Sequence, residues 1–134
     1  MTTVLLIAVS LAAWGCWLLW CARTFADRST ALMLKSWPQK LDQYKDGRRY
    51  LGTEAGIVFY RCRHHWGDQR AEFLILARTA RGQWFEAEAK VFAVRKVTPV
   101  TVIRTLTDEH AQEWLGAFQA HAEIRRYFGA VEIA

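Results

Sequence analysis

The stretch from Gln83 to Val94, QWFEAEAKVFAV, decides the fold of this chain. Side chains of two kinds alternate along it, with the period of two that a half-buried antiparallel β-strand requires. One face carries Phe85, Ala87, Ala89, Val91 and Ala93. The other face carries Trp84, Glu86, Glu88 and Lys90. The pattern predicts a strand with its first face against a core and its second face toward solvent.

Further strands are predicted on both sides of this stretch, because β-branched and aromatic residues are enriched there between turn signals. These strands are expected over residues 48–53, 56–63, 70–79 and 100–106. Residues 64–69 contain Gly67-Asp68 and are expected to form a turn. The sequence therefore predicts a small antiparallel sheet of four or five strands.

A helix is predicted after the last strand. Thr107 is a suitable N-cap, and Asp108 and Glu109 place negative charge in the first turn, where the helix dipole favours it. Gly129 is the expected stop. An apolar stripe with helical spacing runs through Ala111, Trp114, Leu115, Phe118 and Ala122. This stripe should lie across the open face of the sheet, which makes the soluble module an α+β fold.

The N-terminal segment has a different composition from the rest of the chain. Residues 1–22 contain no charged side chain, and the 19 residues from Val4 to Ala22 are almost entirely apolar. As a helix they reach roughly 28 Å, close to the thickness of a hydrocarbon core. We therefore expect a single transmembrane helix over residues 1–22. Three alternatives stay open: a signal peptide cleaved after Ala26, a lipoprotein signal at Cys16, and a buried core helix.

Tryptophan and arginine side chains mark the expected membrane boundary. Indole rings are favourable at a membrane–water interface, with the apolar body inward and the N–H toward the headgroups. The expected membrane anchors are Trp14, Trp17, Trp20, Arg23 and Arg28.

The basic residues predict the orientation of the chain. None precedes the apolar segment, and seven follow it closely: Arg23, Arg28, Lys35, Lys40, Lys45, Arg48 and Arg49. The positive-inside rule then places the N-terminus outside and the C-terminal module in the cytoplasm. The high arginine and alanine content favours a bacterial protein, and hence a single-pass protein of the bacterial inner membrane.

The net charge of +5 is distributed unevenly. Residues 23–49 carry seven basic and three acidic side chains, a net of +4, whereas residues 50–134 carry eleven and ten, a net of +1. We therefore expect a basic juxtamembrane linker or stalk over 23–49 and a soluble module over 50–134. Trp37-Pro38 should interrupt any helix in the linker, and residues 39–46 should form a short helix closed by Gly47. The nearly neutral module argues against nucleic acid as a partner.

One cluster of residues could support metal or nucleophilic chemistry. Cys62 and His64 should share a strand face, with His65 adjacent, and a thiolate and an imidazole suit zinc. A closed site needs four ligands, however, and no second pair has ligand spacing. We expect no catalytic residue, no metal and no cofactor. The alternative is a membrane-tethered hydrolase or metalloprotein that uses Cys62, His64 and His65.

The strongest binding signal is a group of basic residues around one hairpin. Arg61, Arg63 and Arg70 flank it, and Trp66 is expected at its tip, so this group could contact an anionic partner. Exposed strand edges would offer another chain a place to pair. The sequence therefore predicts a non-enzymatic binding or assembly element, whose partner is the lipid bilayer together with another protein or a second copy of the chain.

Overall fold

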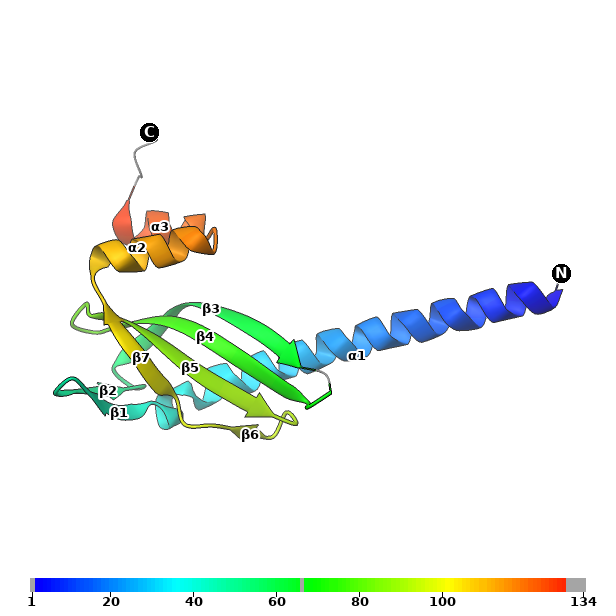
Figure 1. The fold of residues 1–134 in the computed structure, drawn as a ribbon, viewed down its shortest axis with the longest axis horizontal. Helices are drawn as coiled ribbons and strands as arrows, with labels where there is room; N and C mark the ends of the chain where they lie inside the picture. Colours follow the sequence, from blue (N-terminus) through cyan, green and yellow to red (C-terminus); the bar gives the residue numbers. More distant parts are fainter. Residues whose placement is uncertain (1, 66, 130–134) are drawn as a thin grey trace.

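A long helix, an antiparallel sheet and two short helices make up an α+β fold in the computed structural model, which describes residues 2–65 and 67–129 (Figure 1). In chain order the elements are α1 (Thr2–Lys40), β1 (Asp42–Lys45), β2 (Arg48–Leu51), β3 (Ala55–His65), β4 (Arg70–Thr79), β5 (Trp84–Phe92), β6 (Lys96–Val97), β7 (Thr101–Leu106), α2 (Asp108–Ala117) and α3 (His121–Phe128). The predicted fold class is confirmed.

Five strands form the main sheet, in the order β3-β4-β5-β6, and β7 also pairs with β5. All pairings are antiparallel, and β1 and β2 form a separate two-stranded hairpin. The strand predicted over 70–79 matches β4. The turn predicted over 64–69 begins too early, because His64 and His65 still pair with Ala71 and Arg70 in the β3–β4 ladder.

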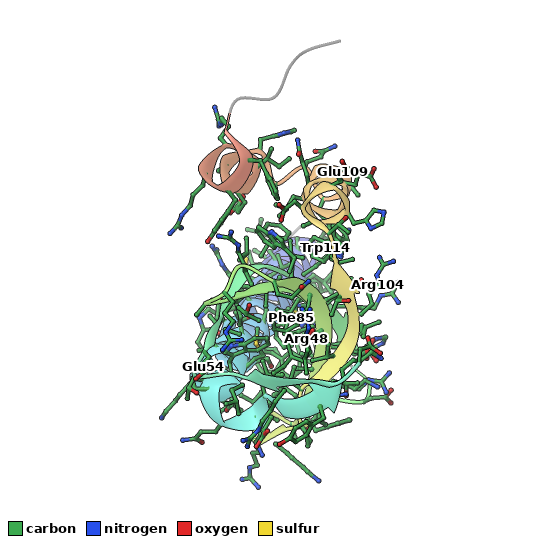
Figure 2. All side chains as sticks on the ribbon, turned by 90° about the vertical axis from the view of Figure 1, so that its left-hand side faces the viewer. Arg48, Glu54, Phe85, Arg104, Glu109 and Trp114 are labelled. Carbon is green, nitrogen blue, oxygen red and sulfur yellow. The ribbon has the colours of Figure 1, made fainter. Side chains whose placement is uncertain are left out.

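Both faces of β5 are packed, which corrects the expectation of a solvated face. Phe85 faces a core shared with α1, whereas Trp84 faces a second core shared with α2 and α3. Figure 2 shows Phe85 and Trp114 in these two layers. The short helices cover only the end of the sheet near Trp84, so Glu88 and Lys90 remain half-exposed at the other end.

The second half of α1 packs along the sheet. Ser29, Met33 and Trp37 recur every four residues, so they share one side of the helix, and all three are buried. The predicted interruption at Trp37-Pro38 is wrong, because α1 continues to Lys40 with Pro38 inside it. Pro38 lies in the last turn of α1, where its missing N–H removes one helical hydrogen bond. Part of the segment expected as a linker thus belongs to the core.

A β-hairpin replaces the short helix predicted over residues 39–46. Asp46 and Gly47 have φ of 52° and 76°, and Lys45 pairs directly with Arg48. Two left-handed residues between paired strands make the two-residue turn for which Asp-Gly is favoured. The helix prediction was wrong because this turn signal specifies the hairpin locally.

The first half of α1 projects away from the sheet (Figure 1). Its apolar side chains are exposed, among them Trp14, Trp17 and Trp20, which are 62%, 55% and 64% exposed. Such a large exposed apolar surface is typical of contact with a membrane. Among the described residues, α1 is the one helix long and apolar enough to cross a membrane, by length and composition.

Two helices stand where one was predicted after the last strand. The Thr107 cap is confirmed, because its hydroxyl accepts a hydrogen bond from the His110 N–H at 3.2 Å. The chain then breaks at Gln119, whose φ is 56°, and α3 ends before Gly129 as expected. The break changes which residues face the sheet. Ala122 is exposed rather than buried, and Ile124 takes the core position.

Candidate functional site

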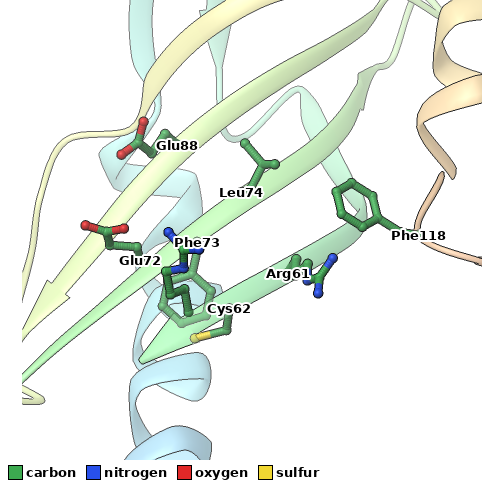
Figure 3. A pocket seen from close by; sticks show the side chains of 8 residues that line it. Arg61, Cys62, Glu72, Phe73, Leu74, Glu88 and Phe118 are labelled. Carbon is green, nitrogen blue, oxygen red and sulfur yellow. The ribbon is translucent and has the colours of Figure 1, made fainter. Parts of the chain in front are cut away.

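A groove lies on the part of the sheet that α2 and α3 leave uncovered (Figure 3). It has a volume of about 650 Å³. Strands β3, β4 and β5 and the residue that ends α2 line it: Arg61, Cys62, Arg63, Glu72, Phe73, Leu74, Glu88 and Phe118. The alternation of side chains along each strand decides which of these point into the groove.

The strand register arranges the groove in two rows across the sheet. In the first row Arg61 lies opposite Leu74, which lies opposite Glu88. In the second row Arg63 lies opposite Glu72, which lies opposite Lys90. Directly opposed side chains are close neighbours in a sheet. The two arginines both lie on β3 and the two glutamates lie on β4 and β5, so positive charge gathers at the β3 side of the groove and negative charge toward the middle of the sheet.

The acidic groups of the groove are already paired. Glu72 lies 3.3 Å from the Nε of Arg70 and 3.5 Å from the Nε2 of His65. Glu88 lies 3.7 Å from the Nζ of Lys90. The positive charges of Arg70 and Lys90 reduce the repulsion of these carboxylates toward an anionic ligand.

The two basic groups on β3 are more available. Arg61 and Arg63 are exposed and form no ion pair within residues 2–65 and 67–129. The Arg61 guanidinium lies 5.1 Å from the centre of the Phe118 ring, which is within the range of a cation–π interaction. The groove therefore presents two cations beside an apolar floor formed by Leu74 and Phe118.

The backbone of β3 adds a second binding element. In the described part of the chain β3 pairs only with β4, so its other side is a sheet edge. One edge carbonyl, that of Ala55, accepts a hydrogen bond from the indole of Trp37 at 2.9 Å, and the register shifts between Ile57 and Phe59. Both features protect the first half of the edge, since a bulge and a capped carbonyl impede further pairing. The half that carries Arg61 and Arg63 has neither.

The predicted partner-binding residues have different positions. Arg61 and Arg63 lie in the groove, and Arg70 lies beside it, where it holds Glu72 and approaches Asp68 at 3.8 Å. Trp66 lies outside the described residues. Sequence reasoning missed Leu74, Glu88 and Phe118 as lining residues, since only the register and the break after α2 bring them to the same groove.

The cysteine and histidine cluster does not converge on one point. Cys62 and His64 face α1, with the Sγ of Cys62 3.7 Å from the Nδ1 of His64, whereas His65 lies on the groove face against Glu72. Burial raises the pKa of the Cys62 thiol to about 11, so the thiol stays protonated at neutral pH. Among residues 2–65 and 67–129 no three His, Cys, Asp or Glu side chains are placed to hold a metal ion together.

The expected membrane anchors lie along α1. Trp14, Trp17 and Trp20 are on the projecting half, where the rings of Trp14 and Trp17 are 5.8 Å apart. Arg23 and Arg28 are exposed at the start of the half that packs on the sheet.

Comparison of the chain with protein-family models, with curated proteins and with solved structures gives no match. The groove, the open strand edge and the apolar helix are the features of the chain that bear on its function.

Proposed function

We propose that this chain is a single-pass protein of a bacterial inner membrane, with its N-terminus outside and its module in the cytoplasm. The module acts as a non-enzymatic binding or assembly element for another protein or for a second copy of the chain. The exposed apolar half of α1 supports the anchor, and the basic residues that follow it support the orientation.

The observation that carries the binding role is the combination of an open strand edge with two unpaired cations. An extended segment of a partner pairs with the half of β3 that carries Arg61 and Arg63, as in recognition by strand addition. Backbone hydrogen bonds supply affinity that does not depend on sequence. Acidic side chains of the segment are selected by the two arginines, and an apolar one by Leu74 and Phe118.

The alternative, a membrane-tethered hydrolase or metalloprotein built on Cys62, His64 and His65, receives less support. It needs a thiolate, and burial raises the pKa of Cys62 to about 11. It also needs the three side chains on one side of β3, whereas His65 faces away from the other two.

Site-specific photocrosslinking of the full-length chain in cells tests the binding role. A photoreactive residue replaces Arg63, and the control position is Tyr44, which is 72% exposed on β1 away from the groove. We expect a crosslinked product of defined mass from position 63 that is absent from position 44. The charge reversal Arg61→Glu should remove most of it. A product of equal yield from both positions, or none from position 63, would contradict the proposal.

Protease protection tests the anchor and its orientation. A C-terminal tag on the full chain should stay with the membranes, resist protease added outside spheroplasts, and be cut after lysis. A tag that is cut from outside would reverse the orientation. Mass spectrometry of the N-terminus distinguishes an intact anchor from a signal peptide cleaved after Ala26.

A further inference from the structure

The membrane boundary can be located on the folded module, because α1 is one unbroken helix. Its last residue in the charge-free segment is Ala22, and the ring of Phe25 contacts the ring of His64 at 5.9 Å between centroids. Phe25 is the third residue after Ala22, which places it about 4.5 Å further along the axis. The end of β3 therefore lies within about 10 Å of the hydrocarbon boundary if α1 crosses along the bilayer normal.

Two turns share this end of the sheet. The β3–β4 turn includes Gln69 and the β5–β6 turn includes Ala93. The backbone N–H of Ala93 donates a hydrogen bond to the backbone oxygen of Gln69 at 2.8 Å. In Figure 1 both turns lie at the end of the sheet from which the first half of α1 projects. The polar layer on each side of a bilayer is about 5–8 Å thick, and both turns lie at the end of the sheet that faces it.

The side chains of this end suit such a layer. Arg95 and Lys96 are exposed, and neither forms an ion pair within the described residues. Phe92 precedes them and is 36% exposed, although it is aromatic. Arg23 adds a further exposed cation where α1 leaves the apolar segment. Asp68 adds one exposed carboxylate, whose charge is offset by Arg70 at 3.8 Å. The remaining groups are cations beside an aromatic ring, the combination that a headgroup layer favours.

We propose that this end of the module, formed by residues 67–69 and 92–96, is a lipid-binding surface for the phosphate headgroups of anionic phospholipids in the host bilayer. Arg95 and Lys96 bind the phosphates, and Phe92 lies among the headgroups. The contact fixes the module upright, with α2, α3 and the β4–β5 turn pointing away from the membrane. The inference rests on the insertion of α1 in the proposed function. It does not rest on the partner groove or on which side of the membrane the module faces.

A depth measurement on the reconstituted full-length chain tests the surface. The three native cysteines are replaced by alanine, and a fluorophore is attached to a single cysteine at Gly67 or, as control, at Ala80. A Cβ at Gly67 would meet nothing within 4 Å, and Ala80 is exposed at the far end of β4. The ten residues of β4 put about 33 Å between the two ends. Vesicles of phosphatidylcholine, with or without phosphatidylglycerol, carry a lipid with a nitroxide on its headgroup.

We expect quenching of the probe at position 67 and none at position 80, with stronger quenching at 67 when phosphatidylglycerol is present. The double reversal Arg95→Glu with Lys96→Glu should abolish that increase. A matched reversal, Arg125→Glu with Arg126→Glu on the exposed side of α3, should retain it.

Four results would overturn the inference. Equal quenching at positions 67 and 80 would mean that the module lies flat or stands away from the bilayer. A phosphatidylglycerol effect that survives the reversal at 95 and 96 would exclude these two residues as the lipid ligands. A chain that fails to float with the vesicles would contradict both this surface and the proposed anchor, whereas a chain that floats without quenching at 67 contradicts the surface alone.

Discussion

The indole Nε1 of Trp37 donates a hydrogen bond to the backbone oxygen of Ala55 at 2.9 Å, and this bond joins α1 to the edge strand β3. The same ring stacks on Phe85 at 6.3 Å between centroids. One side chain therefore connects the helix to both the edge and the centre of the sheet. Because Trp37 and Ala55 are buried, water cannot replace the bond if it is lost.

The first prediction concerns this bond. Trp37→Phe keeps an aromatic ring near Phe85 but leaves the Ala55 oxygen without its donor, so we expect a loss of about 1–3 kcal/mol in the free energy of unfolding. Guanidinium unfolding of the full chain in mild detergent, followed by circular dichroism, measures it. Trp14→Phe, on the exposed half of α1, is the control and should leave the midpoint unchanged. Equal midpoints for both variants would show that the bond contributes nothing.

Gly52 is predicted to tolerate no side chain. A Cβ there would clash with the backbone oxygen of Trp37 and lie 2.7 Å from the Cα of Pro38. Backbone atoms at the end of a packed helix have little freedom to move, so Gly52→Ala should destabilise the module by about 1–3 kcal/mol. Gly56→Ala is the matched control, since its Cβ would meet nothing within 4 Å. Thermal unfolding of the two variants compares them, and the same melting temperature for both would contradict the prediction.

Val94 is predicted to be a strained position. Its φ is 55°, a left-handed conformation that costs an L-residue about 1–2 kcal/mol. Glycine adopts the same conformation without this steric cost. Val94→Gly should therefore raise the free energy of unfolding by about 1 kcal/mol. Val94→Ala removes the same side chain beyond Cβ but keeps the strain, so it should show no such gain. A fall in stability for the glycine variant would mean that packing of the valine outweighs the strain.

The stability of the module is predicted to fall as the pH rises from about 9 to 11. The thiol of Cys62 has an ordinary pKa of 9.0, and burial raises it to about 11 in the folded chain. In that pH range the unfolded chain has lost the thiol proton while the folded chain keeps it, so ionisation favours unfolding. Cys62→Ala should flatten this part of the curve of unfolding free energy against pH. An unchanged slope would assign the alkaline loss to other groups, such as Tyr50, whose pKa burial also raises.

The same burial predicts slow thiol chemistry. At pH 8 Cys62 should react with a maleimide more slowly in the folded chain than in the denatured chain, because the thiolate is the reactive form. Mass spectrometry of the peptide that contains Cys62 gives both rates. A faster reaction in the folded chain would revive the hypothesis of a nucleophilic cysteine.

The sheet was predictable because its signals are local. The alternation around Phe85 identifies β5, and Thr107 identifies the start of α2, since each depends only on neighbouring residues. The prediction of a helix over 39–46 was wrong. The correct structure could have been predicted, because Asp46-Gly47 is a strong local signal for a hairpin. The covered second face of β5 could not be anticipated from alternation, because it depends on where α2 and α3 come to lie.

The candidate groove was predictable only in part. The basic character of Arg61 and Arg63 is visible in the sequence, but their neighbours Leu74 and Glu88 depend on the register of β3, β4 and β5. Phe118 reaches the groove because α2 ends there, and no capping residue in the sequence predicts this helix end. Residue types thus indicated the charge of the site, and long-range pairing determined its shape.

The two halves of α1 form one unbroken helix. With α1 inserted as proposed, any reorientation of the helix in the lipid therefore also reorients the module. A tilt of about 20° would shift the end of α1 at Lys40 sideways by about 8 Å relative to Phe25. Insertion of one alanine after Arg23 would turn the whole module about the helix axis by about 100°. Bilayer thickness and the phase of this helix therefore set the direction in which the groove faces.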